Sequence, residues 1–188
     1  GGGSSFLGNY FNYLSSPFTV LIFLFDKADI SFAITALVIV KCMASAVTFT
    51  YYLKASQKRH SYVSAAFGVF YAFCAYFLAY YWNIMWIDGM ILLPLIVLGI
   101  EQLVHNGKGA LYTGALAVLL LSNYYMGYMA CIFSVLYFLA YFLMTAKPRP
   151  EKSGEKLTTR EKYSAKNLMR HPFLNRCARF AGFSLLAG

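Results

Sequence analysis

Long apolar stretches, separated by short polar segments, make up most of this 188-residue chain. A transmembrane helix needs about 20 apolar residues in a row, and about 17 to 25 are tolerated. Residues 30–53 and 61–81 satisfy that length, whereas residues 90–104 satisfy it only if the helix extends into its flanks or the bilayer thins locally. The pattern predicts an all-α fold, that of a polytopic helical integral membrane protein.

The longest apolar stretch, residues 110–146, is too long for one helix and is interrupted by the polar segment 122–127. Asn and Gly in that segment are typical of a tight turn. We therefore predict two helices there, residues 110–125 and 126–146. In total the sequence predicts about five complete membrane-spanning helices, and residues 177–188 begin a truncated sixth span.

Residues 1–29, ahead of the first long stretch, are predicted to form an outer-face loop with a short interfacial helix. Residues 17–25 are apolar but too few to cross a bilayer. Ser16 before Pro17 suits a helix start, because Ser caps a helix and Pro fits its first turn. The chain opens with Gly and Ser residues that are either an artificial linker or a native glycine-rich loop, and we expect it to be a fragment of a longer protein.

Positive charge gathers on one side of the predicted bundle of residues 30–146. Only 12% of the residues are charged, against about 25% in globular domains, yet the net charge is +9. Residues 147–176 hold nine Lys and Arg, whereas the loops of the opposite side hold one, Lys27. Basic loops of membrane proteins stay in the cytoplasm, so this charge reflects topology and contact with membrane lipid, not nucleic-acid binding.

The rule that basic loops stay in the cytoplasm also predicts on which side of the membrane the shorter loops lie. The segments around Lys58 and Lys108 are basic and are predicted to be cytoplasmic, like residues 147–176. Asp88 and Asn123 then fall on the outer side of the cytoplasmic, or inner, membrane.

Lys41 lies in the middle of a predicted span, where a charge costs at least ~2.5 kcal/mol. It should therefore face the bundle and meet an acceptor, because lipid offers none. A structural ion pair and contact with a ligand such as a phosphate remain equally open. Glu101 is thirteen residues beyond Asp88, which is roughly 20 Å along a helix and too far for the two carboxylates to act as a pair.

Asp88 is the acidic residue with the most informative surroundings, because it lies at the outer boundary between two tryptophans and the next helix. One interpretation is a helix-starting cap, since a carboxylate in the first turn is stabilised by the helix dipole. The other is a catalytic or metal-binding group that faces an outward cavity. The residues alone favour the cap, and no metal-ligand motif is present.

The other candidates for substrate binding flank Asp88 or form the second outer turn. Asn123 is explained by turn chemistry, and the less favoured, functional alternative is that a sugar stacks on the neighbouring tyrosines. The candidates on the outer side are Trp82, Asn83, Trp86, Asn123, Tyr124 and Tyr125. Lys41 joins them as a candidate for contact with a phosphate.

These motifs resemble the YfhO family of bacterial membrane proteins. The similar segments are Asn83-x-x-Trp86-x-Asp88, the run LLPLIVLGIE over residues 92–101, and SNYYMGY over residues 122–128. The opening, with YFNYLSSPF over residues 10–18, is similar as well. The resemblance extends to about residue 141, and the spacing from the tryptophan–aspartate motif to the LPL run is unusual for a generic span.

The resemblance implies a glycosyltransferase of the GT-C type. Such an enzyme takes a sugar from a polyprenyl-phosphate carrier on the outer face and transfers it to a cell-surface polymer such as lipoteichoic acid. It also implies a catalytic acid in an outer loop ahead of Gly1, so that this fragment is inactive alone and Asp88 is a secondary acidic group. A divalent metal would suit the departing phosphate.

A transporter or flippase component for lipid-linked saccharides is the main alternative, and a scaffold without activity is a third. Transporters more often place paired broken helices at the bilayer midplane. Here the irregular segments 82–89 and 122–127 are predicted on the outer face. That placement favours chemistry or binding at the membrane surface.

Overall fold

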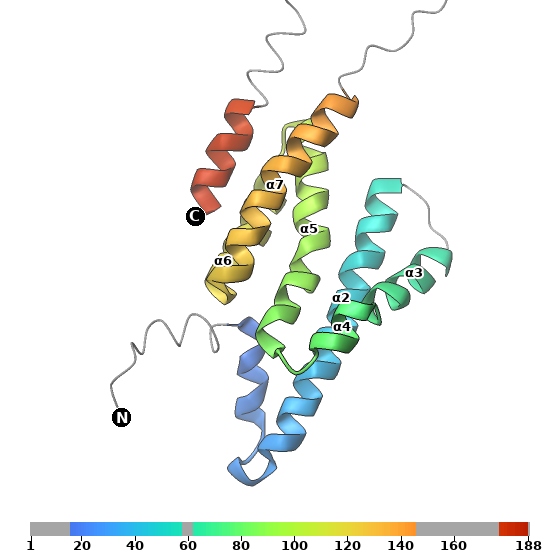
Figure 1. Ribbon diagram of the computed structural model, residues 1–188, viewed down its shortest axis with the longest axis vertical. Coiled ribbons are helices and arrows are strands. Elements are labelled where there is room, and N and C mark those ends of the chain that lie inside the picture. The colour runs from blue at the N-terminus through green and yellow to red at the C-terminus, as the bar shows by residue number, and fades with distance from the viewer. Residues whose placement is uncertain (1–15, 58–61, 146–176, 188) are drawn as a thin grey trace, which may run out of the picture.

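The computed structural model describes residues 16–57, 62–145 and 177–187, which are almost entirely helical, with no strand among them (Figure 1). Two short 3-10 helices come first, and α-helices follow. In chain order the elements are η2 (Pro17–Leu24), η3 (Lys27–Asp29), α2 (Ile30–Gln57), α3 (Tyr62–Ala72), α4 (Ala75–Tyr80), α5 (Ile84–Asn106), α6 (Ala110–Ser122) and α7 (Tyr124–Thr145). A further apolar helix follows at Cys177–Ala187.

Helix α5 lies at the centre of the bundle, and α2, α6 and α7 pack directly on it (Figure 1). The most apolar stretch of 18 residues in α5 is 61% buried, whereas the corresponding stretches of the other three long helical segments are 22–28% buried. It ends at Gly107, which has a φ of 69° and whose N–H donates to the Leu103 carbonyl. Glycine adopts this left-handed conformation readily, so the chain can leave the helix there and turn back into α6.

Two clusters of apolar side chains hold the helices together. The larger joins α5, α6, α7 and the helix Cys177–Ala187, and at its edge Phe138 stacks on Phe180 with ring centroids 4.2 Å apart. The smaller joins the start of α5 to α4, through Phe77, Ile87 and Ile91. Residues of α2 pack against this second cluster, so α5 belongs to both.

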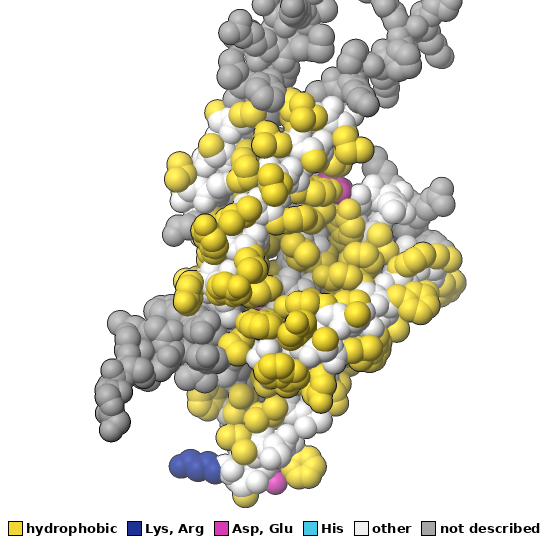
Figure 2. Space-filling view, in the orientation of Figure 1, with side chains coloured by type: hydrophobic (Ala, Val, Ile, Leu, Met, Phe, Trp, Pro, Cys, Tyr) yellow, Lys and Arg dark blue, Asp and Glu magenta, His cyan; other side chains and the backbone are white. Residues whose placement is uncertain are grey.

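Four helical segments of the described chain are long and apolar enough to cross a membrane. They are Lys27–Gln57, Tyr62–Tyr80, Ile84–Asn106 and Tyr124–Met144. Large apolar side chains cover much of the surface of these helices, and little charge appears among them in Figure 2. Lipid removes the cost of exposing such a surface, which confirms the predicted class of a polytopic helical membrane protein.

Two predicted helices differ in detail from the observed ones. The span predicted at residues 61–81 is the segment Tyr62–Tyr80, but it is broken between α3 and α4, where Cys74 takes an extended conformation. Residues 90–104 are only part of α5, which starts at Ile84 and is 23 residues long. Most of the segment 82–89, which the sequence predicts as an outer loop, is therefore helix.

One predicted span is shorter than expected. The helix predicted at residues 110–125 is α6, which has only 13 residues. At 1.5 Å per residue it measures about 20 Å, less than the ~30 Å of a bilayer core. The chain turns early because Asn123 is extended and begins a new helix.

The short helix at the N-terminal side of α2 is present, but as the 3-10 helix η2, which packs on α2. Pro17 occupies its first turn, as predicted. Ser16 occupies the N-cap position, as predicted, but its side chain makes no capping hydrogen bond. The predicted loop of residues 1–15 and the basic loop of residues 147–176 lie outside the described residues.

Candidate functional site

A buried ion pair joins α2 to the first part of α5. The Nζ of Lys41 lies 2.8 Å from Oδ1 of Asp88, and the two side chains are 0% and 2% exposed. Lys41 also donates to the carbonyl of Ile84, at 2.9 Å, and its ammonium lies 5.8 Å from the ring centre of Phe18. The prediction that Lys41 faces the bundle and finds an acceptor is therefore confirmed.

The position of Lys41 follows from the periodicity of α2. The buried residues of this helix are spaced four apart, at Ala33, Leu37, Lys41 and Ser45. Residues at this spacing share one helix face, and small residues on it let two helices approach closely. The face therefore packs on α5 and carries Lys41 toward it.

Asp88 does not cap the helix start. Helix α5 begins at Ile84, and its first turn contains no acidic residue, so Asp88 lies one turn further in. Lys41 is the partner of this carboxylate, and no other described residue donates a hydrogen bond to either of its oxygens. Asp88 is thus a buried, charge-paired carboxylate with unused capacity to accept hydrogen bonds.

Three other candidates surround the start of α5 in different environments. Asn83 is buried and precedes the helix without a side-chain capping bond. Trp82 is 65% exposed, and its ring N–H donates to the carbonyl of Ala79. Trp86 is half-buried and packs on Tyr80, with ring centroids 5.4 Å apart. The structure therefore gathers aromatic rings around this end of α5, near the ion pair.

Asn123 acts as the N-terminal cap of α7. Its Oδ1 accepts a hydrogen bond of 3.0 Å from the Met126 N–H, and its side chain is fully buried. Turn chemistry therefore accounts for Asn123, as predicted. The adjacent Tyr124 and Tyr125 are 58% and 47% exposed, so their rings face outward from the bundle.

A second polar cluster, around Glu101, was not predicted. Tyr52 and Tyr137 each donate to its Oε1 at 3.0 Å, and Ser56 donates to Oε2 at 2.7 Å. The cluster joins α2 and α7 to α5, thirteen residues along α5 from Asp88. The sequence contained one indication of this cluster: Tyr52 and Ser56 are four residues apart, so they share one face of the helix that also carries Lys41.

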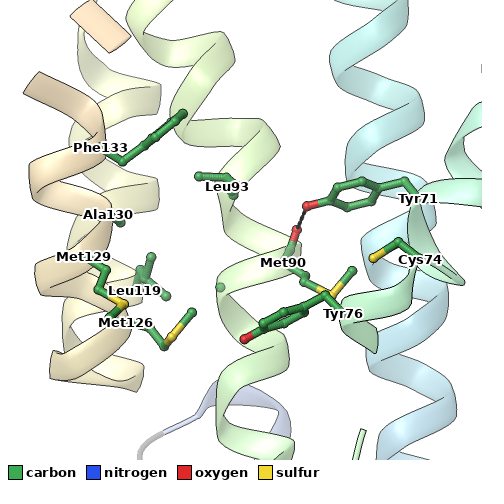
Figure 3. Close-up of a pocket in the computed structure, with 11 residues that line it drawn as sticks. Tyr71, Cys74, Tyr76, Met90, Leu93, Leu119, Met126, Met129, Ala130 and Phe133 are labelled. Atoms are coloured by element: carbon green, nitrogen blue, oxygen red, sulfur yellow. Dashed lines mark hydrogen bonds between the residues drawn. The ribbon is translucent and has the colours of Figure 1, made fainter. Parts of the chain in front are cut away.

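A cavity of about 360 Å³ lies beside the start of α5, between α3–α4 on one side and α7 on the other (Figure 3). Gly89 and Met90 form part of its wall, but Asp88 is not among its lining residues. The structure thus places the acidic residue behind this cavity, toward α2. Within the described ranges, no group of three His, Cys, Asp or Glu residues is arranged to bind a metal.

The helical bundle, with its lipid-facing apolar surface and buried ion pair, defines a multi-pass membrane protein. The sequence model of the bacterial membrane protein YfhO matches residues 1–188, and the chain belongs to this family. It is also 35% identical over 72 residues to the uncharacterized protein YfhO of Bacillus subtilis (strain 168). That match covers 38% of this chain and 8% of the relative, and no solved structure matches the chain.

Proposed function

We propose that the chain is part of a GT-C-like glycosyltransferase of the bacterial cytoplasmic membrane. The full-length protein would take a sugar from a polyprenyl-phosphate carrier and transfer it to a cell-surface polymer, such as lipoteichoic acid, on the outer face. Membership of the YfhO family supports a membrane-embedded role. The activity, the donor and the acceptor are parts of this proposal.

The observation that carries the proposal is the buried pair of Lys41 and Asp88. Ionisable groups within a membrane are expensive and mark functional sites more often than structural ones. Replacing a buried ion pair by apolar residues of similar volume is often neutral or stabilising, so stability alone does not account for this pair. The unused acceptor capacity of Asp88 also suits a ligand that carries hydroxyl groups, as a sugar does.

The chemistry of sugar transfer determines which roles the two residues of the ion pair could have. An acceptor hydroxyl attacks the anomeric carbon of the donor sugar, the bond from that carbon to the phosphate oxygen breaks, and polyprenyl phosphate leaves with the bonding electrons. A carboxylate must take the acceptor proton, and positive charge must stabilise the departing phosphate. We assign Asp88 to orienting the acceptor and Lys41 to balancing charge, and we expect the main base to lie ahead of Gly1.

A metal-bound reaction finds no support in the described residues. Divalent cations such as Mg²⁺ and Ca²⁺ take several oxygen ligands, and Asp88 is one carboxylate already paired with Lys41. The site as described does not fit such an ion, so no step is assigned to one.

Variants of the ion pair test the proposal in the full-length protein. Asp88→Asn alone would leave Lys41 buried without its counter-charge and would destabilise the fold by about 3–5 kcal/mol. A loss of activity in that variant would then not be distinguishable from a loss of folded protein. The double variant Lys41→Met with Asp88→Asn removes both charges and nearly keeps the volume. We expect it to reach the membrane at a normal level and to reduce sugar incorporation into the surface polymer by at least ~10-fold.

The control is Lys27→Met, because Lys27 is the exposed lysine at the start of the same helical segment. It should leave incorporation unchanged. Normal incorporation by the double variant, measured per amount of membrane protein, would rule out a role for the pair in transfer. If the double variant instead stops movement of the lipid-linked saccharide across vesicle membranes and leaves transfer intact, the chain belongs to a transporter or flippase.

A further inference from the structure

We propose that the cavity between α3–α4 and α7 holds one acyl chain of a membrane phospholipid. The inference concerns a site apart from Lys41 and Asp88 and does not depend on sugar transfer. The cavity has a volume of about 360 Å³, within the range of sites that hold small ligands. Helix α5 forms its floor, and the two walls come from helices far apart in the sequence (Figure 3).

The lining selects an apolar occupant. It consists of aliphatic, aromatic and sulfur-containing side chains, with two tyrosines as its polar members. The hydroxyl of Tyr71 already donates to the carbonyl of Met90, at 2.9 Å, so it offers no free donor to a ligand (Figure 3). Tyr76 is then the remaining hydroxyl group of the lining, so a sugar or phosphate inside this cavity would lose most of its hydrogen bonds to water without replacement, which is costly.

The walls are suited to a flexible chain. Met90, Met126 and Met129 contribute unbranched side chains that adapt their shape to what they contact. At Gly89 an added Cβ would lie 2.8 Å from the terminal carbon of Met126, so the glycine leaves room for this methionine side chain against α5. A narrow, adjustable apolar slot fits a hydrocarbon chain better than a rigid ring system.

The surroundings identify the occupant as lipid. Met129 and Phe133 line the cavity and are also 47% and 39% exposed, so the cavity continues into the lipid-facing surface of α7. The helices on both sides are long enough to span the bilayer, so an opening between them meets hydrocarbon. Phospholipid is the hydrocarbon present there in greatest excess, and mass action favours its chain.

The aromatic residues near the start of α5 place the lipid's polar end. Tyr76 lines the cavity, and its ring lies 5.3 Å from that of Tyr80, which in turn packs on Trp86. Tyr and Trp gather at the headgroup level of membranes. The chain therefore enters the cavity from this end and runs along α5 toward Leu93.

Filling the cavity tests the inference in the full-length protein. The variant Leu93→Phe with Met129→Phe adds bulk to two lining residues, on the floor and on one wall. The matched control is Leu121→Phe with Met144→Phe, at positions 63% and 75% exposed on the outer surface of α6 and α7. Phospholipid bound per protein is measured by phosphorus analysis and mass spectrometry after extensive detergent washing, with thermal unfolding as the check on folding.

We expect the wild type and the control to retain about one phospholipid per protein and the filled variant to retain at least ~5-fold less. Phosphatidylglycerol with a photoreactive acyl chain should also cross-link to Met126 or Phe133 in the wild type. Three results would overturn the inference: no retained lipid in the wild type, equal retention in the filled variant, or a retained isoprenoid instead of phospholipid. Absence of the cross-link in the wild type would overturn it as well. None of these results bears on sugar incorporation, which is measured separately.

Discussion

Two carboxylates of α5 fix how α2 lies against it. Asp88 pairs with Lys41, and Glu101 accepts hydrogen bonds from Tyr52 and Ser56. The two contacts are thirteen residues apart along α5, about 20 Å. Apolar helices gain little by leaving lipid for one another, so polar contacts of this kind set which helices pair and in what register.

The Glu101 cluster should contribute measurably to stability. Tyr137→Phe removes one hydroxyl donor, and we expect a loss of about 0.5–1.5 kcal/mol in the free energy of unfolding. Glu101→Leu leaves three hydroxyl groups without their acceptor and should cost more than Tyr137→Phe. Thermal unfolding in detergent measures both.

Tyr128→Phe is the matched control, since Tyr128 is 64% exposed on the same helix as Tyr137. It should not change the unfolding temperature. Equal unfolding temperatures for Tyr137→Phe and Tyr128→Phe would show that the hydrogen bonds to Glu101 do not stabilise the bundle.

The sequence predicts part of this residue-level picture. It predicts that Lys41 needs a partner within the protein, because the lipid core offers no hydrogen-bond acceptor. It does not predict that the partner is Asp88, because α5 starts at Ile84, nearly two turns earlier than the apolar pattern from residue 90 suggests. Nor does it find Tyr137 beside Glu101, since 36 residues separate them and only packing brings them together.

At the scale of elements, close backbone approach determines how α5 and α6 pack. A Cβ built on Gly99 would lie 2.5 Å from the backbone nitrogen of Tyr112 and 2.6 Å from its Cα. Backbone cannot move aside as a flexible side chain can. The short connection of Gly107 to Gly109 and this contact together bring the two helices side by side.

Gly99→Ala should therefore force α5 and α6 apart and destabilise the protein by about 1–3 kcal/mol. Gly114→Ala is the matched control on α6, because no atom lies within 4 Å of its added Cβ. It should be neutral, or slightly stabilising, because Ala is the better helix former. The unfolding temperatures of the two variants in detergent check this, and equal values would argue against the close contact.

Element boundaries were the least predictable part of the fold. The turn at Asn123 has a local chemical cause and is visible in the sequence. The break between α3 and α4 contains neither Pro nor Gly, and it coincides with tertiary contacts of its two sides. Tyr71 donates to the Met90 carbonyl, and Cys42 Sγ lies 4.0 Å from the Ala72 carbonyl.

At the scale of the whole molecule, the class of protein was predictable because lipid imposes a simple length and polarity rule. The orientation in the membrane remains a prediction, and cysteine labelling in intact cells tests it. Tyr124→Cys should react with an impermeant reagent from outside, whereas Lys108→Cys should react only after the membrane is opened. Labelling of Lys108→Cys in intact cells would show that the orientation is opposite to the predicted one.

The 13 residues of α6 have a consequence for the membrane itself. A helix of about 20 Å that starts level with one surface stops roughly 10 Å below the other. The turn at Asn123 would then lie below that surface, where the bilayer thins locally to match the short helix. Aromatic rings such as Tyr124 and Tyr125 would line this thinned region, and a water-soluble polymer could reach groups that a flat bilayer would keep out of reach.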